Sequence, residues 1–448
     1  MTTIKNRKLF RLFIINFSIF TILTGDLMSS NLPKYYTKTL ENGLKIVAIP
    51  MENGTNVVST DVYYKVGSRN EIMGKSGMAH MLEHLNFKST SNLKSGEFDE
   101  IVKGFGGVNN ASTSFDYTHY YIKSSSKNMD KSLGLFSELL ENLTLKDEEF
   151  QPERNVVAEE RRWRTDNNPM GYLQFRLFNN AFIYHPYHWT PIGFMKDIQN
   201  WSIEDIKEFH STYYQPKNAI VVVAGDITKE EVFFSATKHF NDIKNTKDIP
   251  DLIHMEEPKQ DGEKRITIRK DSQVQMLAMT FHIPNFEHKD QVALSALSEL
   301  LSGGKSSVLN KVLIDEKAMV NSVYAYNMEL KDPGVYMIIA VSNPGIKAKD
   351  VEKEILKILK QVQKGKIKQK ELDKIKINTK ADFIFSLDSS SSVASLYGSY
   401  FVRDNIEPLF NYEKNIEELK LEDIVNVAKK YLTKQNSTTV ILKKENNE

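Results

Sequence analysis

The segment from Gly77 to Thr90, GMAHMLEHLNFKST, decides how the rest of the chain is interpreted. On a helix, residues four positions apart lie on one face, so His80 and His84 can present two imidazole nitrogens to one tetrahedral cation. Glu83 lies beside that face and can reach a reacting water without binding the metal, which is what a general base requires. A helical histidine alone is usually structural, so this interpretation needs a third ligand.

The stretch PERNVVAEERRWRTDN, residues 152–167, offers that ligand. We expect a helix with Pro152 in its first turn, preceded by an acidic segment that suits the positive helix end. One inward stripe is then formed by Glu153, Val156, Val157 and Glu160. An unpaired buried carboxylate is costly, so Glu160 is predicted to bind the metal and Glu153 to accept a ring N–H from a ligand histidine.

The other charged residues of this helix are expected to face solvent. They fall largely off the stripe, and they are Arg154, Glu159, Arg161 and Arg162. Glu159 is the alternative metal ligand. A surface helix rich in ion pairs four residues apart would explain the charges but not the stripe.

Composition narrows the classes of protein. The 448 residues are 40 % hydrophobic and 26 % charged, with a net charge of +1. This length predicts two domains, and the balanced charge argues against a nucleic-acid partner. Because there is no cysteine, any metal must be bound by His, Asp or Glu.

The N-terminus has the pattern of an export signal. A basic segment, KNRKLFR, precedes a twelve-residue apolar run, Leu12 to Leu23, which is shorter than a membrane-spanning helix. Residues 1–31 are therefore predicted to be a signal peptide, which indicates the bacterial periplasm or cell envelope. Alternatively the segment stays uncleaved and tethers the protein to the inner membrane. This tether would then be the only contact of the protein with a membrane.

Strand-like and helical runs alternate, which predicts an α+β fold. A faint repeat pairs 203–226 with 421–444, and Asp205 and Tyr213 each recur 218 positions later. Near the same offset, Leu297 and Leu301 occupy the positions of the two histidines. The prediction is two homologous sheet-and-helix domains facing each other across a cleft: a metal-binding domain at 32–245, a linker at 246–262, and a domain without the metal residues at 263–448.

Three motifs in this order, GMAHMLEHLNFKST, GGVNNASTSFDYTHYY and PERNVVAEERR, resemble the insulinase–pitrilysin family of zinc metallopeptidases. That family includes mitochondrial processing peptidases and small two-domain bacterial members. The resemblance implies one Zn²⁺ per chain, bound by His80, His84 and Glu160, with Glu83 as general base and Glu153 in support. It also implies an endopeptidase that acts on peptides or unfolded segments.

The resemblance also assigns a role to Asn110 and Ala111. In relatives this segment is an edge strand, and its main chain pairs with the peptide substrate as an added strand. The local sequence, a Gly-Gly pair followed by a β-prone run, fits that role. It fits a plain buried strand equally well.

The chain departs from the family in its second half. Active relatives carry an arginine and, seven residues later, a tyrosine that support the developing oxyanion. Here Ile314 and Asn321 stand at those positions, and no arginine occurs between Arg269 and Arg403. The predicted protein is therefore the zinc-bearing subunit of a heterodimer whose homologous partner supplies the Arg/Tyr pair.

Three alternatives to the heterodimer stay open. The chain could form a homodimer, or it could work alone with Tyr324 or another group in the missing role. It could also be a non-catalytic structural or peptide-binding subunit of a larger complex.

Overall fold

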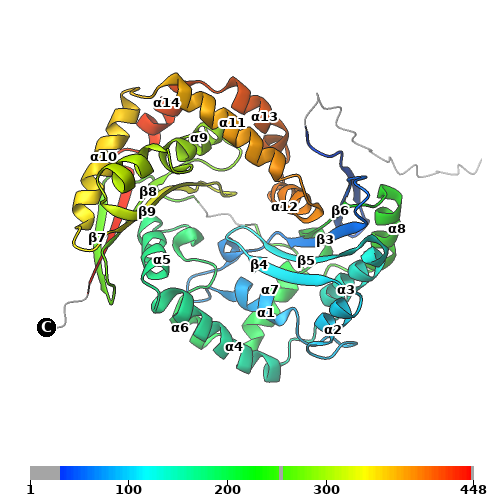
Figure 1. Ribbon diagram of the computed structural model, residues 1–448. Coiled ribbons are helices and arrows are strands. Elements are labelled where there is room, and N and C mark those ends of the chain that lie inside the picture. Colours follow the sequence, from blue (N-terminus) through cyan, green and yellow to red (C-terminus); the bar gives the residue numbers. More distant parts are fainter. Residues whose placement is uncertain (1–30, 252–255, 445–448) are drawn as a thin grey trace, which may run out of the picture.

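The computed structural model describes residues 31–251 and 256–444, so residues 1–30 of the predicted signal segment, 1–31, lie outside the described residues. Within these two ranges, no helix has the length and apolar character needed to cross a bilayer. The chain folds into two mixed sheets with many helices, which confirms the predicted α+β class (Figure 1).

The first half contains a six-stranded sheet in the order β1-β2-β6-β3-β5-β4. Its strands are β1 (Tyr36–Thr39), β2 (Lys45–Pro50), β3 (Val57–Tyr64), β4 (Val108–Thr113), β5 (Thr118–Ser125) and β6 (Ala219–Gly225). Its helices are α1 (Met78–Leu85), α2 (Glu97–Gly104), α3 (Met129–Asn142), α4 (Asp147–Arg161), α5 (Pro169–Ala181), α6 (Met195–Asn200), α7 (Ile203–Tyr213) and α8 (Lys229–Phe240). β2 and β6 are parallel, and the other pairs are antiparallel.

The second half contains a five-stranded sheet in the order β7-β11-β8-β10-β9. Its strands are β7 (Lys264–Lys270), β8 (Met276–His282), β9 (Val320–Met328), β10 (Val335–Ser342) and β11 (Ser437–Lys444). Its helices are α9 (Gln291–Ser302), α10 (Ala348–Gln363), α11 (Gln369–Phe385), α12 (Ser390–Phe401), α13 (Glu407–Glu418) and α14 (Leu421–Tyr431).

The two sheets share one topology. If β1 is set aside, the first sheet has the parallel pair β2-β6 at one end, followed by the antiparallel strands β3, β5 and β4. The second sheet has the parallel pair β7-β11 at one end, followed by the antiparallel strands β8, β10 and β9, which is the same order along the chain. Helices α7 and α14 have the same length and are 218 positions apart, and the third residue of each, Asp205 or Asp423, accepts the N–H three residues before it. This match indicates that the two halves share one fold, while the exact domain limits stay predictions.

The halves are interlocked because each lends a helix to the other. Helix α5 packs on β8 and β11 of the second sheet, where Leu173 and Leu177 lie against Val440 and Leu442. Helix α12 packs on β3 and β6 of the first sheet, on the right of Figure 1. Gly398 is needed there, because a Cβ would come within 2.2 Å of the Tyr63 ring.

Helix α4 differs from its prediction in three ways. It begins at Asp147, so Pro152 lies inside the helix and the acidic residues occupy its first turn, where they suit the helix dipole. Val156 is 50 % exposed, so only Val157 of the apolar pair joins the core. Arg161 is not solvated: its guanidinium donates to the Gly193 carbonyl and to Asp166 and lies over the Phe175 ring.

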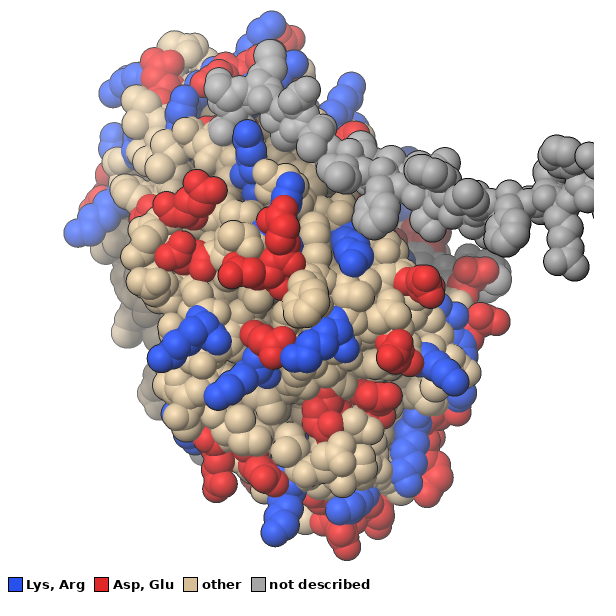
Figure 2. All heavy atoms as spheres, turned by 90° about the vertical axis from the view of Figure 1, so that its right-hand side faces the viewer, with Lys and Arg blue, Asp and Glu red and all other residues tan. Residues whose placement is uncertain are grey.

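Surface charge is mixed on the face shown in Figure 2. Basic and acidic side chains are interspersed there, in keeping with the net charge of +1. Because the two signs alternate, this face has no large region of one electrostatic sign.

Candidate metal centre

Helix α1 is fixed by its apolar face. Met78, Ala79, Met81, Leu82 and Leu85 are buried in the core of the first half. Gly77, at the start of the helix, has a φ of 88°, and a Cβ there would meet the Ile192 carbonyl and the Trp201 ring. The remaining face, with His80, Glu83 and His84, lines an open pocket of about 1080 Å³.

Helix α4 brings Glu160 to the two histidines. The Glu160 Oε2 atom lies 3.6 Å from His80 Nε2 and 3.4 Å from His84 Nε2, and one atom from each residue lies within 4.8 Å of the others. Oε2 is buried and has no hydrogen-bond partner among the described residues. A buried carboxylate oxygen facing two imidazoles fits a cation, and this donor set suits zinc with one position left open.

Glu153 lies behind His84. Its Oε1 is 2.7 Å from His84 Nδ1, and Lys88 is 2.7 Å from its Oε2. If Nδ1 carries the proton, the Nε2 lone pair is free to point toward Glu160, which is how a carboxylate orients a ligand histidine. The geometry agrees with the supporting role predicted for Glu153.

The two histidines have different pKa values because their charged neighbours differ. Burial lowers the pKa of His84, but the hydrogen bonds and charges of Glu153 and Glu160 outweigh it and raise this pKa to about 9. Burial and the neighbouring His84 lower the pKa of His80 to about 4. Without a metal, a proton on His84 balances the carboxylates, and metal binding has to displace that proton.

Glu83 faces the pocket without joining the trio. Thr113 of β4 donates a hydrogen bond to its carboxylate, and burial raises the pKa of Glu83 above the ordinary value. A raised pKa suits a base that takes up a proton near neutral pH. The carboxylate of Glu159, the alternative ligand, pairs instead with Arg162.

Asn110 and Ala111 lie on β4, the edge strand of the first sheet, and line the same pocket. The Ala111 N–H donates to the side-chain oxygen of Asn110 at 2.9 Å. Because the N–H is used in this bond, we infer that it points away from β5, and an added strand could accept it once the Asn110 side chain releases it.

The pocket is lined by residues from His80 to Ile192, so no described residue of the second half lines it. Leu297 and Leu301 of α9 are fully buried in the second core. Tyr324 and Tyr326 lie on β9 and are 60 % and 58 % exposed. Neither tyrosine lines the pocket.

Sequence reasoning missed three residues that shape the site. Thr113 holds Glu83, Arg164 lies 2.9 Å from Glu160 Oε1, and Glu71 accepts hydrogen bonds from the first turn of α1. For Arg164 a signal existed, because it follows Glu160 by four residues. Thr113 reaches Glu83 from a strand 30 residues away, and Glu71 reaches the start of α1 across a short irregular loop, so neither helical nor strand spacing marks them.

Two family models match the chain. The model described as Insulinase (Peptidase family M16) matches residues 46–188, which contain the whole trio and Glu83. The model described as Peptidase M16 inactive domain matches residues 200–379. The division agrees with the placement of the metal residues in the first half alone.

Relatives cover nearly the whole chain. A zinc protease of Helicobacter pylori (strain ATCC 700392 / 26695), PqqE, is 56 % identical over 95 % of this chain and 97 % of its own length. A probable mitochondrial-processing peptidase subunit beta of Arabidopsis thaliana is 26 % identical over 89 % of this chain and 76 % of its own. The crystal structure of a protease from Helicobacter pylori superposes with a TM-score of 0.90, at 57 % identity, over 92 % of this chain and 100 % of that chain. The chain thus belongs to peptidase family M16, the insulinase family.

Proposed function

We propose that this chain is the zinc-bearing subunit of an endopeptidase that hydrolyses peptides or unfolded segments. The observation that carries the proposal is the approach of one donor atom each of His80, His84 and Glu160 to within 4.8 Å of one another, in a pocket that the Glu83 carboxylate also lines. The name zinc protease given to the relative with 56 % identity supports the same metal and reaction.

His80, His84 and Glu160 would hold one zinc ion, and Glu153 would keep His84 in the required tautomer. When bound, zinc supplies Lewis-acid activation of water for attack on a peptide carbonyl. Glu83 would take the proton from that water and return it to the departing amine. Thr113 keeps the Glu83 carboxylate turned into the pocket.

Substrate binding is assigned to β4. The outward N–H of Ala111 offers a main-chain donor to an extended peptide, and main-chain pairing tolerates many side chains. A peptide or unfolded segment can adopt the required extended form, whereas a folded protein cannot without local unfolding.

Among the described residues, the second half of the chain brings no donor for the developing oxyanion into this pocket. Ile314 has no side-chain donor, and neither Asn321, whose amide can donate, nor the exposed Tyr324 lines the pocket. We therefore assign that task to a homologous partner subunit carrying an Arg/Tyr pair, because such electrophilic support is commonly a large catalytic term. The N-terminal export pattern supports the periplasm or cell envelope as the location of this chain.

The test measures zinc content and cleavage of an unstructured fluorogenic peptide, for the purified chain alone and with its candidate partner. We expect one zinc per chain, little cleavage alone and rapid cleavage by the pair. Rapid cleavage by the chain alone would remove the need for a partner. Zinc without cleavage in either case would identify a peptide-binding subunit, and absence of zinc would refute the metal centre.

A further inference from the structure

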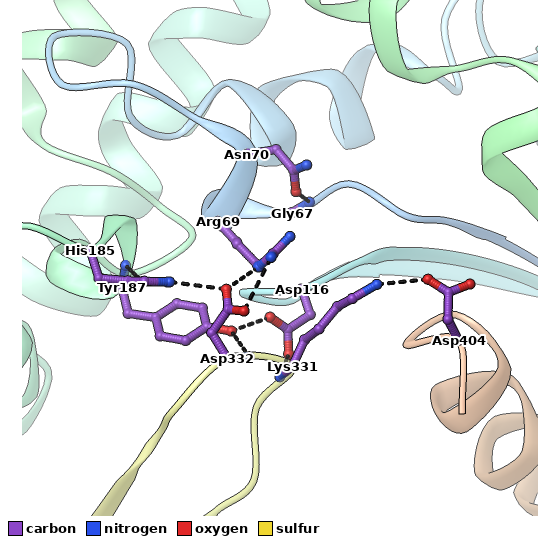
Figure 3. A network of polar contacts seen from close by, with 9 residues as sticks. All are labelled: Gly67, Arg69, Asn70, Asp116, His185, Tyr187, Lys331, Asp332 and Asp404. Carbon is purple, nitrogen blue, oxygen red and sulfur yellow. Dashed lines mark hydrogen bonds and ion pairs between the residues drawn. The ribbon is translucent and has the colours of Figure 1, made fainter. Parts of the chain in front are cut away.

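The turn between β9 and β10 of the second half enters a polar network on the first half (Figure 3). Asp332, in this turn, contacts the guanidinium of Arg69, with Oδ1 3.2 Å from the terminal Nη2 atom, and lies 3.0 Å from His185 Nε2. The Asp332 N–H donates to the Tyr187 hydroxyl, which in turn donates to Asp116. One aspartate thus joins two separate segments of the first half.

These contacts are shielded from solvent. His185 is 1 % exposed, Tyr187 is fully buried, and the Asp332 side chain retains 21 % of its exposure. Ion pairs in such surroundings have a fixed geometry, and loss of one partner leaves the other charge uncompensated. Arg69 and His185 are therefore tied to the second half of the chain through the position of Asp332.

Both segments continue to the same carboxylate, that of Glu71. Arg69 precedes Glu71 by two residues, and Tyr187 precedes Trp189 by two. The Trp189 indole N–H donates to Glu71 Oε2 at 2.8 Å. The segments also lie side by side, since the short helical turns at Ser68–Asn70 and Pro186–His188 are in contact.

Glu71 caps the metal helix α1. It accepts the backbone N–H groups of Gly77 and Ala79, both at 2.8 Å. The first N–H groups of a helix have no partner within the helix, and the glycine at the start of α1 has no side chain to supply one. His80 follows Ala79 directly, so this cap fixes the end of the helix that carries the predicted ligands.

We propose that Asp332, in the half without the metal residues, is a positioning residue for the zinc site. It holds the segments that carry Glu71 and Trp189, and Glu71 holds the first turn of α1 in place. The inference deepens the proposed function and rests on it for the identity of the metal. It gives the second half of the chain a role in the chemistry of the first.

A neighbouring aspartate offers a matched control. Asp404 also lies in the second half and pairs with Lys65 of the first half, as well as with Lys331 (Figure 3). Asp404 contacts neither Arg69 nor His185, and it reaches Asp116 and Tyr187 indirectly, because it pairs with the side chain of Lys331 while the Lys331 N–H donates to Asp116. A general loosening of the two halves would follow from loss of either aspartate, whereas loss of α1 positioning would follow from loss of Asp332 only.

The experiment compares Asp332→Asn, Asp404→Asn, Glu71→Gln and the double variant Glu71→Gln/Asp332→Asn. Two quantities are measured on the full chain: hydrogen-exchange protection of the α1 amides without metal, and zinc affinity by competition with a chelator. Outer partners of metal ligands typically change affinity by about 10- to 100-fold. We expect a loss in that range for Glu71→Gln and about 3- to 10-fold for Asp332→Asn, with matching losses of α1 protection.

The double variant should be no worse than Glu71→Gln alone, because both changes act through one cap. Asp404→Asn should match wild type in both measurements. Unchanged α1 protection in Asp332→Asn, equal losses in the two aspartate variants, or additive losses in the double variant would each overturn the proposal. If Asp332→Asn does not fold, Arg69→Lys replaces it with the same expectation, since lysine lacks the planar fork.

Failure of the proposed function has a different signature. A wild-type chain that binds no zinc refutes the metal centre, yet the exchange measurement still decides whether Asp332 positions α1.

Discussion

Helices α1 and α9 occupy equivalent places in the two halves, but one lines a pocket with polar residues and the other is buried in a core. In α1 the outer positions are His80 and His84, which keep 13 % and 22 % of their side-chain exposure and line a pocket. In α9 the corresponding residues, Leu297 and Leu301, are fully buried. The sheet order is the same in both halves, so the fold does not require the metal site.

This comparison locates the functional difference in a few side chains. Helix α4 supplies a carboxylate opposite α1, whereas the helices packed on α9 close over two leucines. Apolar packing of this kind stabilises a core without a cation. In our proposal, the second half therefore contributes stability and positioning, while the first half bears the reactive groups.

The most severe test makes α1 resemble α9. In His80→Leu/His84→Leu, two of the three predicted ligands are lost, so zinc should fall from about one ion per chain to about none. Cleavage by the completed enzyme should be abolished. Thermal unfolding of the metal-free protein should be little changed, because leucine packs well at the same positions of α9.

Zinc content is measured on the purified variant by atomic emission. Retention of one tightly bound ion would place the metal elsewhere in the chain. Glu159→Gln serves as the control, because the Glu159 carboxylate pairs with Arg162, and it should keep its zinc. Loss of zinc in that variant would transfer the ligand role from Glu160 to Glu159.

The second test separates the base from the metal. Glu83→Gln should keep zinc and lose cleavage by about 10²- to 10⁴-fold, the usual contribution of a general base. Zinc content and the rate of peptide cleavage are measured on the same sample with the partner present. Retained turnover would remove Glu83 from the reaction.

Much of the site was predictable because its spacing is helical. The positions of His80 and His84 follow from one helical turn, and Glu160 could be inferred from the cost of burying a carboxylate. Val156 and Arg161 were placed on the wrong sides of α4. Their exposure depends on where α1, α5 and the pocket lie around that helix, which a single-helix pattern does not contain.

The positioning network was out of reach of sequence reasoning. Asp332 and Arg69 are 263 residues apart, and their contact depends on how the two halves are docked. The repeat did predict that the halves share a design, since Asp205 and Asp423 cap equivalent helices. It did not predict that α5 and α12 each pack on the other half's sheet, because an apolar helix face does not identify its partner.

A third test makes α9 resemble α1. Leu301→His puts an imidazole into the second core, where it has no predicted partner, and should reduce the free energy of unfolding by about 2–4 kcal/mol. Leu356→His on α10 is the control, because Leu356 is 46 % exposed, and its effect should stay within about 0.5 kcal/mol. Urea unfolding measures both. Equal effects would show that the α9 position is not a sealed core site.

A fourth test uses pH on the contact between the halves. Burial raises the pKa of Asp332, but hydrogen bonds from His185 and Arg69 outweigh it and lower this pKa to about 2. An unfolded aspartate titrates near pH ~3.9, so the contact contributes stability above that pH and loses it as pH falls toward about 2. The contribution is about 2 kcal/mol.

Urea unfolding with a chelator present, from neutral pH downward, compares wild type with Asp332→Asn. The difference between them should shrink as the solution is acidified. A difference that does not change with pH would mean that the charge of Asp332 is not what stabilises the contact.

The smallest expected effect concerns the edge strands β4 and β9, which occupy the same place in the two sheets. Ala111→Pro on β4 removes an N–H that faces away from β5, a position where an edge strand tolerates proline. One hydrogen bond is worth about 1 kcal/mol, so kcat/KM of the completed enzyme should fall about 3- to 10-fold while zinc affinity is unchanged. Asn110→Ala frees the same N–H and should not lower kcat/KM. If Ala111→Pro cleaves peptide as fast as wild type, the main chain at this position does not pair with substrate, and β4 is an ordinary edge like β9.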